Sequence, residues 1–383
     1  MSKRYDELDS LRGLAAATVV FCHLLPLGNF WLMNKLDKTP FHLLWAGHEA
    51  VILFFILSGF VLSLPYYNND FKKPIYKNYL IRRICRIYLP YAVSVIIAIV
   101  CMKSFYSIDF FKLGGWFDKP ISSDLVLNHA VLITEFDSYR FNMVVWSLVH
   151  EMRISLIFPL LMFLVLKFSW KRNLILSVSG SIFFYVLYVA FLKVFNYDAT
   201  KLQGSYLYTI HYFGFFVAGA LLAKNREHLN LIYAKMGRSL KITLLVAGVL
   251  AYTYNWWFLN DLSIVHLLIV NDWIIAVGAA IFILFFVNSK AISSLVLKRP
   301  IRFVGKISYS LYLYHLIVAL SVANYFHGKL PMEVITGISI ALTFIVATVM
   351  YYLIENPSIN LGKIMTQPKK SKHLGAEKLS RIA

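Results

Sequence analysis

Ionisable side chains stand inside long apolar stretches of this sequence, where charge is costly. His150, Glu151 and Arg153 open an apolar run, directly after Trp146 and Ser147. Charged groups inside a bilayer usually face the interior of a helix bundle or a water-filled cavity and have a function there. These residues are therefore the first candidates for catalysis or binding.

A second ionisable group, His23, lies inside the first apolar stretch of the chain. At 1.5 Å per residue, His23 and Glu151 fall at the same depth on antiparallel spans, about 12 Å below one membrane face. A carboxylate beside an imidazole holds its tautomer and stabilises the imidazolium, as general-base catalysis requires. We therefore predict that His23 and Glu151 form a catalytic pair. The alternative is a structural histidine bonded to a neighbouring carbonyl.

Two further groups have open roles. His150 and Arg153 are three residues apart and share a helix face, from which Glu151 points away. Arg153 either pairs with a carboxylate on another span or supplies positive potential to a developing oxyanion. His315, in a later apolar stretch that also contains Tyr309, is more typical of a bonded core histidine than of a catalyst.

Basic side chains mark the start of the third apolar stretch. Arg83 and Arg86 stand one helical turn apart there, and paired guanidinium groups suit the oxygens of a phosphorylated ligand. Contact with lipid headgroups is the alternative. Asp9 and Arg12 form either a surface pair or a pair that reaches into a vestibule. Ser58 lies in a small-residue segment that favours close helix packing or close approach of a ligand.

The composition indicates a polytopic membrane protein. Of 383 residues, 59% are hydrophobic and 15% are charged, with a mean hydropathy of +0.65, whereas about 25% of a soluble domain is charged. Ten segments are long and apolar enough to span a bilayer: residues 11–27, 48–64, 88–102, 144–166, 174–192, 206–223, 242–258, 269–287, 307–325 and 334–354. We expect an all-α fold, a bundle of about ten transmembrane helices around a polar cavity.

The basic residues are divided unevenly between the loops. With the N-terminus on the cytoplasmic side, 28 Lys and Arg residues fall on that side and 9 on the other, which is a positive-inside signal. Both termini are therefore predicted to be cytoplasmic, and the first span shows no cleavable signal pattern. The net charge of +19 follows from these short loops, so it indicates anionic lipid headgroups as partners rather than nucleic acid.

The segments outside the predicted spans carry few signals. Residues 103–143 include Gly-Gly-Trp-Phe at 114–117, which suits sugar rings, a lid or an interfacial aromatic belt. Residues 1–362 are expected to form one membrane domain, and 363–383 a basic, disordered cytoplasmic tail. There is no internal repeat. The spacing of Cys22, Cys85 and Cys101 implies neither a disulfide framework nor a zinc site.

Six segments, in this order, resemble the membrane-bound acyltransferase family 3. They are 8–16 (LDSLRGLAA) followed by His23, 53–60 (LFFILSGF), the Arg-x-x-Arg of 83–86 followed by Ile87 and Pro90, the Trp-Ser-Leu-x-x-Glu of 146–151, 306–315 (KISYSLYLYH), and 354–357 (IENP). One such motif is weak, but six in order across nearly the whole chain are specific.

The resemblance implies an enzyme of the bacterial cytoplasmic membrane. Such an enzyme moves an acyl group, usually acetyl, from cytosolic acyl-coenzyme A to a hydroxyl of an extracytoplasmic glycan or lipid-linked saccharide, without a metal. By this resemblance His23 is the essential histidine, Glu151 the motif carboxylate, and Arg83 and Arg86 the pair that binds coenzyme A phosphates. We add Arg12 and Ser58 as donor-binding candidates. The further candidates are Asp9, Trp146, Ser147, Arg153, Tyr309 and His315.

This sequence departs from the commonest family pattern in places that bear on the acceptor. Ala50 stands where many members have glycine, and Arg153 stands where an apolar or aromatic residue is frequent. The chain ends soon after the tenth predicted span, so we expect it to lack the hydrolase-like domain that some members carry. It would then complete the transfer alone or with a separate partner.

Three hypotheses of different classes follow. In the first, His23 takes the proton of the acceptor hydroxyl while Glu151 orients it, or His23 carries the acyl group covalently. In the second, the intramembrane His and Glu form the proton relay of a transporter or flippase of lipid-linked sugars. In the third, the protein is a structural subunit of an envelope assembly complex. Binding of coenzyme A distinguishes the first from the second, and the third predicts tolerance to substitution at His23, Glu151 and Arg83.

Overall fold

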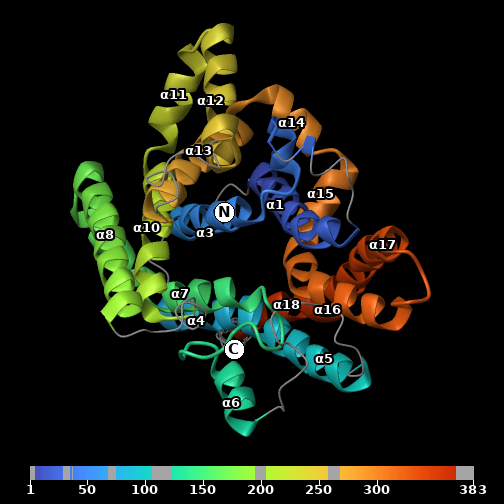
Figure 1. Cartoon of the computed structure of the whole chain (residues 1–383). Helices are drawn as coiled ribbons and strands as arrows, with labels where there is room; N and C mark the ends of the chain where they lie inside the picture. Colours follow the sequence, from blue (N-terminus) through green and yellow to red (C-terminus); the bar gives the residue numbers. More distant parts are fainter. Residues whose placement is uncertain are drawn as a thin grey trace, which may run out of the picture.

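The computed structural model describes residues 5–28, 35–36, 38–67, 75–105, 122–194, 204–257 and 268–367. Every regular element in these ranges is helical, as the apolar segments predict (Figure 1). The long helices are α1 (Asp6–Leu24), α3 (Gly47–Ser63), α5 (Leu89–Phe105), α7 (Val145–Lys167), α8 (Trp170–Val194), α10 (Tyr206–Lys224), α12 (Arg238–Trp257), α13 (Leu268–Asn288), α16 (Ser308–Phe326) and α17 (Met332–Met350).

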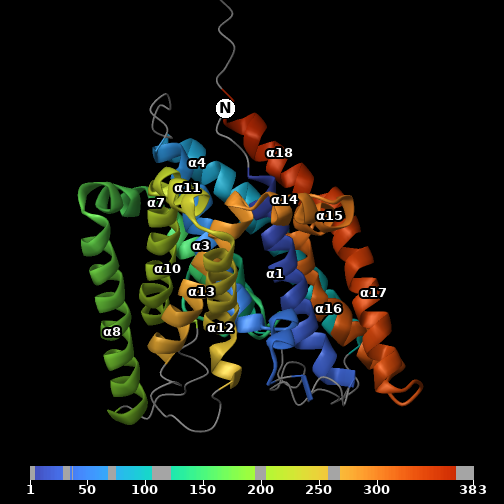
Figure 2. The same ribbon diagram turned by 90° about the horizontal axis from the view of Figure 1, so that it is seen from above.

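Short helices collect at one end of this bundle (Figure 2). They are α4 (Tyr76–Arg83), α11 (Arg226–Lys235), α14 (Lys290–Val296), α15 (Arg299–Lys306) and α18 (Asn356–Met365). Because most of them carry Lys or Arg, we call this the basic end. Helix α1 begins and α18 ends there, so the two predicted terminal segments share one side. Which side faces the cytoplasm stays a prediction.

Each of the ten predicted spans corresponds to a long helix, and most of these helices have the length and hydropathy of a membrane span. Eight helices among the described residues are long and apolar enough to cross a membrane, or nine if α15 and α16, bent by 73°, form one broken span. The segment predicted at 242–258 is helix α12, which lies outside this set. Its polar ends, including Arg238 and Asn255, lower its mean hydropathy. The expected polar cavity at the centre stays a prediction.

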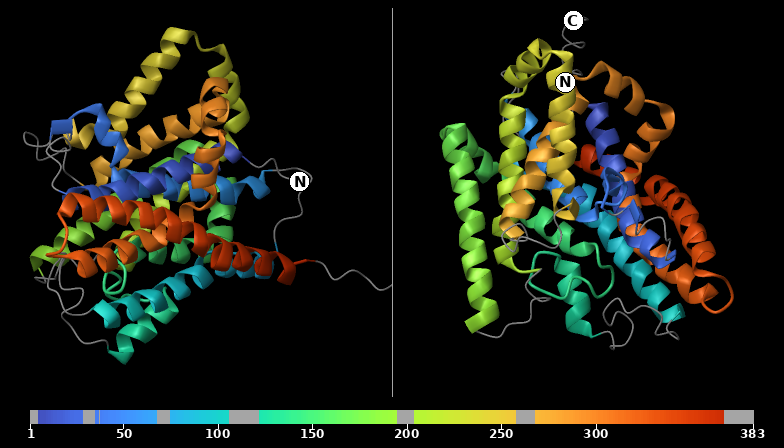
Figure 3. Two further views of the ribbon diagram at one scale, coloured as in Figure 1. Left: turned by 90° about the vertical axis from the view of Figure 1, so that its right-hand side faces the viewer. Right: turned by 45° about the horizontal axis from the view of Figure 1, so that its top comes forward.

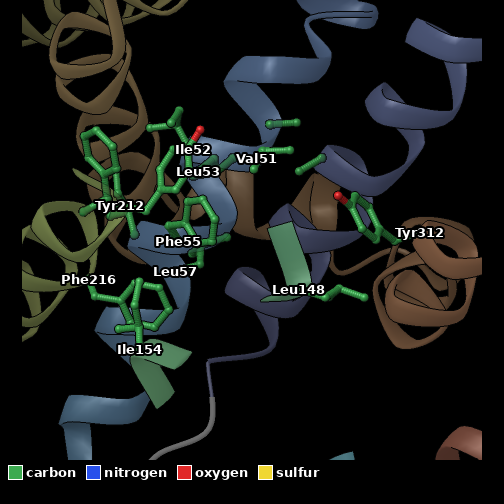
Figure 4. Packing of buried hydrophobic residues seen from close by; sticks show 14 of the residues in the cluster. Val51, Ile52, Leu53, Phe55, Leu57, Leu148, Ile154, Tyr212, Phe216 and Tyr312 are labelled. Atoms are coloured by element: carbon green, nitrogen blue, oxygen red, sulfur yellow. The ribbon is translucent and has the colours of Figure 1, made fainter. Parts of the chain in front are cut away.

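Helix α3 is the core of the bundle and packs most closely against α10. A side chain at Gly59 would collide with the Phe216 carbonyl, and one at Gly219 with the Ile56 carbonyl. The two backbones therefore touch, which is the helix packing that the small residues predict. Phe55 packs on Tyr212 and Phe216 along the same interface (Figure 4). Helix α8 stands at the rim beside α10 (Figure 3).

A second close crossing holds α1 against the bent α15–α16 segment. Gly13 of α1 and Gly305 of α15 approach so closely that a Cβ on either would overlap the other backbone. Ser10 also donates to the Val296 carbonyl at 2.9 Å. Helix α1 is thereby fixed beside the first turn of α16, where two of the predicted motifs meet.

Pro357 stands inside the helical path that follows the last predicted span. The chain passes from α17 through a π-helical turn, Tyr351–Glu355, into α18, whose first turn contains Pro357. Proline is tolerated there because the first N–H groups of a helix have no intrahelical acceptor. Residues 114–117 and 368–383, the predicted aromatic loop and most of the tail, lie outside the described residues.

Candidate active site

His23 lies against His315, across the interface of α1 and α16. His23 Nδ1 is 3.1 Å from His315 Nε2, and the two rings are stacked with centroids 5.1 Å apart. His315 is fully buried, whereas His23 is half-buried. Two imidazoles thus form the centre of the site, and one of them was expected to be a core residue.

The surroundings of His315 fix the proton positions in this pair. His315 Nδ1 lies 2.8 Å from the Tyr312 carbonyl, and a carbonyl only accepts, so Nδ1 carries a proton. In a neutral ring Nε2 then holds the lone pair and accepts from His23 Nδ1–H. His23 Nε2 is left with its own lone pair. The arrangement therefore presents His23 Nε2 as a base.

Glu151 does not orient His23, so this part of the prediction is wrong. Glu151 accepts from Arg83 at 3.1 Å and from Ser58 at 3.2 Å instead. The error lies in the assumed depth of α7. Asn142, just before this helix, is fully buried and donates to the Leu313 carbonyl at 2.7 Å. Helix α7 therefore begins inside the bundle, and Glu151 lies closer to the basic end than a count from the membrane face indicates.

Arg83 is buried in a hydrogen-bonded group rather than presented to a ligand. Besides Glu151, its guanidinium donates to Ser155 Oγ at 2.6 and 3.2 Å. Its side chain is 10% exposed and that of Glu151 21%. A buried carboxylate and guanidinium stabilise each other when both are hydrogen-bonded. Arg83 and Ser58, both predicted to bind the donor, therefore hold Glu151 in this structure.

Arg86 and Arg12 complete a basic cluster around this pair. Arg86 lies in the π-helical turn Ile84–Tyr88, so it leaves the face of Arg83; it is exposed and has no hydrogen bond within the described residues. Arg12 is bonded to Asp9 at 3.2 Å; whether the pair faces a vestibule stays a prediction. Arg12 also interacts electrostatically with Arg83, Arg86 and Glu151. Arg83 and Arg12 are each paired with a carboxylate, whereas the guanidinium of Arg86 is exposed, and an exposed guanidinium suits a phosphorylated ligand.

Tyr309 connects this cluster to α16. Its hydroxyl donates to the Ile87 carbonyl at 2.8 Å, and the ring lies within electrostatic reach of Glu151 and Glu355. Glu355 accepts from the backbone and hydroxyl of Ser310 at 3.1 and 2.6 Å. A carboxylate at this position caps the first turn of α16. Glu355 was noted only as part of a motif, and its role as a cap was missed.

Between the two centres, the Trp-Ser-Leu segment packs against α16. Ser147 Oγ and the Tyr312 hydroxyl are 2.7 Å apart, and the Trp146 ring lies against His150 and Tyr212. Tyr312 is also the residue whose carbonyl accepts from His315. Ser147 therefore fixes the turn of α16 that positions the histidine pair.

Arg153 is hydrogen-bonded to backbone carbonyls, which corrects the expected pairing with a carboxylate on another span; its role towards an oxyanion stays a prediction. Its guanidinium donates to the carbonyls of Ile133, Thr134 and Gly204 at 2.9, 2.6 and 2.9 Å, and it lies 4.1 Å from the ring centre of Tyr206. It thus binds the segment before α7 to the start of α10 and contacts carbonyls rather than a carboxylate. His150 bonds Thr209 at 2.8 Å beside it.

A third polar group was missed entirely. Asp272 on α13 is fully buried and accepts from His48 at 2.6 Å and from His211 at 2.9 Å. Glu49, next to His48, accepts from Trp256 Nε1 at 2.9 Å. All four ionisable residues stand in predicted apolar segments, so the rule that singled out His23 also applies to them.

The fold is that of a multi-pass membrane protein, and its candidate site combines a hydrogen-bonded pair of imidazoles with a basic cluster, joined by helix α16. The family model of an acyltransferase domain, that of family 3, matches residues 5–352, and the chain belongs to this family. The putative acetyltransferase ORF330 of Acidianus two-tailed virus is 28% identical over 323 residues, 83% of this chain and 84% of that protein. Acyltransferase MdmB of Streptomyces mycarofaciens is 31% identical over 169 residues, 44% of this chain and 42% of its own. No solved structure matches the chain significantly.

Proposed function

We propose that this acyltransferase is an O-acetyltransferase, which takes acetyl from cytosolic acetyl-coenzyme A and delivers it to a hydroxyl of an extracytoplasmic glycan or lipid-linked saccharide. The His23–His315 pair carries the proposal, because its hydrogen bonds leave a lone pair on His23 Nε2. The acetyltransferase name of one relative supports acetyl. The location proposed is the bacterial cytoplasmic membrane, with the basic end inside.

In this mechanism His23 Nε2 accepts the proton of the acceptor hydroxyl, and His315 keeps the ring in that tautomer. The hydroxyl oxygen forms a bond to the acyl carbon as the bond from that carbon to sulfur breaks. The proton on Nε2 then passes to the departing thiolate, so His23 returns to its starting state. General acid–base catalysis of this kind contributes about 10²- to 10⁴-fold. Attack by Nε2 itself, giving an acyl-histidine, is the alternative order of events.

The basic cluster supplies the donor-binding side of the proposal. The exposed guanidinium of Arg86 and the neighbouring Arg12 would bind coenzyme A phosphates, because guanidinium groups bind phosphate oxygens in pairs. Arg83 would act indirectly, by holding Glu151 and Ser155 of α7 in place. Helix α16 joins this cluster at Tyr309 to the base at His315, about 9 Å further along the helix axis.

The test uses the purified full chain in liposomes with radiolabelled acetyl-coenzyme A, wild type beside His23→Ala. We expect saturable binding by both, and transfer of label to envelope saccharides or water by the wild type alone. Label retained on wild-type protein but not on the variant would select the acyl-histidine route. Full transfer by a well-folded His23→Ala would contradict both routes. No binding at all would overturn the enzyme and favour a transporter of lipid-linked sugars.

A further inference from the structure

We infer that Glu49, His48 and Trp256 form a subsite for the hydroxyl groups of a saccharide acceptor, at the end of the bundle opposite the basic end. This inference rests on the proposed function, since the saccharide is the acceptor in the transfer. It assigns the recognition of that acceptor to residues outside the His23–His315 pair.

The subsite lies where four elements meet. Glu49 and His48 stand in the first turn of α3, Trp256 in the last turn of α12, Asp272 in the second turn of α13, and His42 in the short helix Pro40–Leu44. Trp256 donates to Glu49 Oε1 at 2.9 Å. The His42 ring stacks on the Trp256 ring, with centroids 3.9 Å apart.

One oxygen of Glu49 distinguishes this group from an ordinary buried ion pair. Glu49 is 2% exposed, and its Oε2 has no hydrogen-bond partner within the described residues. Both oxygens of the neighbouring Asp272, by contrast, are bound by His48 and His211. A buried carboxylate oxygen without a donor is costly. A ligand hydroxyl would supply the missing donor.

The surroundings of this oxygen suit a sugar. The side chain of His48 is 38% exposed, so a ligand can reach this ring from outside the bundle, with the buried Glu49 behind it. His48 also interacts electrostatically with Glu49. The half-buried ring of Trp256 lies beside these polar atoms, and the buried His42 ring stacks on it. Pockets that combine a few placed polar groups with aromatic walls are typical of small-molecule sites.

The subsite is adjacent to the proposed base. Gly47, which precedes His48, packs so closely on Cys22 that an added Cβ would lie 2.6 Å from its sulfur. Cys22 in turn precedes His23. A saccharide held by Glu49 would therefore lie next to the helix turn that carries the base.

A metal ion fits this group less well than a hydroxyl. Hard cations take about six or more oxygen ligands, whereas one carboxylate oxygen is open here. Among the described residues no group of three or more His, Cys, Asp or Glu side chains is arranged to hold a metal. The indole N–H of Trp256 points at the same carboxylate and repels a cation.

Glu49→Gln provides a sharp test, because Gln keeps the size and the acceptor for Trp256 but replaces Oε2 with an N–H donor. The full chain in detergent is titrated with the methyl glycosides of glucose, galactose, mannose and N-acetylglucosamine, without acyl donor, while the melting temperature is recorded. We expect at least one glycoside to stabilise the wild type saturably, with binding to Glu49→Gln weakened about tenfold. General exclusion of sugars from protein surfaces stabilises all variants equally and does not saturate.

Glu333→Gln is the matched control, since Glu333 is an exposed carboxylate in the first turn of α17. It should bind the glycoside as the wild type does. No saturable stabilisation by any glycoside, or equal stabilisation of Glu49→Gln, would overturn the subsite. Failure of the proposed function appears elsewhere, as absence of acetyl-coenzyme A binding by wild type. With active protein, Glu49→Gln should raise KM for the glycoside and leave KM for acetyl-coenzyme A unchanged.

Discussion

His23 and His315, 292 residues apart in the chain, meet at 3.1 Å between their ring nitrogens Nδ1 and Nε2. His315 in turn bonds the Tyr312 carbonyl of its own helix. The backbone of α16 therefore determines which nitrogen of His23 is basic. In the proposed mechanism, a neutral imidazole takes the place that a carboxylate has in many catalytic pairs, but it cannot stabilise a positive charge on His23 as strongly.

His315 is accordingly a positioning residue, and its substitution should affect turnover rather than donor binding. We expect His315→Ala to reduce kcat for acetyl transfer by about 10²- to 10⁴-fold, the contribution typical of general acid–base catalysis, with KM for acetyl-coenzyme A unchanged. His315→Gln should recover much of the loss, because its amide oxygen accepts from His23 Nδ1–H. His228→Ala, at an exposed histidine of α11, is the control. Equal losses in the Ala and Gln variants would point to a packing role only.

Arg83 and Arg86 should respond differently to the same substitution. Arg83→Gln leaves Glu151 without its cation, so the unfolding free energy should fall by about 3 kcal/mol, and a further Glu151→Gln change should recover part of it. Arg86→Gln should leave the melting temperature unchanged and raise KM for acetyl-coenzyme A about tenfold. Melting curves and donor titrations on both variants decide this. Identical behaviour of the two would restore the phosphate-binding pair that their spacing indicates.

Arg153 should matter for stability and little for chemistry. Arg153→Gln removes charged hydrogen bonds to three carbonyls, so we expect a loss of about 3 kcal/mol or more in unfolding free energy. Arg153→Lys should restore little, because an ammonium group cannot reproduce the planar fork. Transfer per folded molecule, measured at low temperature, should stay within twofold of wild type. A selective loss of kcat would return Arg153 to the reaction.

The α3–α10 contact can be tested with two glycines. Gly219→Ala places a methyl group against the Ile56 carbonyl and should cost about 1–3 kcal/mol, as overpacking does. Gly337→Ala, on α17 with open space around it, should be neutral or slightly stabilising, because alanine favours helix. Comparing melting temperatures separates close packing from a general effect of removing glycine.

Acid should weaken the fold through His129, which lies in α6 (Ser123–Val131) outside the membrane spans. Burial lowers the pKa of His129 to about 4, below the usual 6.5, so the folded protein resists protonation. The unfolded chain then binds more protons between about pH 6.5 and 4, and stability falls as the pH drops through that window. His129→Gln removes this titration. The melting temperature of the wild type should decline more between pH 7 and pH 5 than that of the variant.

Much of the fold followed from apolar length alone, because a span needs about twenty apolar residues wherever it lies. Helix α12 is longer than its apolar segment, and its polar ends lower its mean hydropathy below that of a span. No local pattern reveals the π-helical turn that carries the last span on into α18. The buried Asn142 shows why the depth of Glu151 could not be predicted. Residue counts give depth only when a helix begins at the membrane face, and α7 begins inside the bundle.

The sequence identified most of the ionisable residues of the candidate site, but not which of them contact one another. His23, Glu151, Arg83 and His315 stand out because ionisable residues are rare in apolar segments. Which of them touch depends on how α1, α7 and α16 rotate and where each begins, which neighbouring sequence does not encode. Asp272, His48 and His211 were passed over because they come from three different helices, and only the packing of α3, α10 and α13 brings them together.

In the proposed mechanism, helix α16 sets the distance between the donor-binding cluster and the base. Its first turn is fixed by Glu355 and by the crossing of Gly13 with Gly305. From Tyr309 to His315 the helix then rises by about 9 Å. One residue inserted between Tyr312 and His315 would turn the imidazole by about 100° away from His23, with every side chain of the site still present. In the proposed mechanism, the register of helix α16, more than any single group on it, therefore sets where an acyl group is transferred.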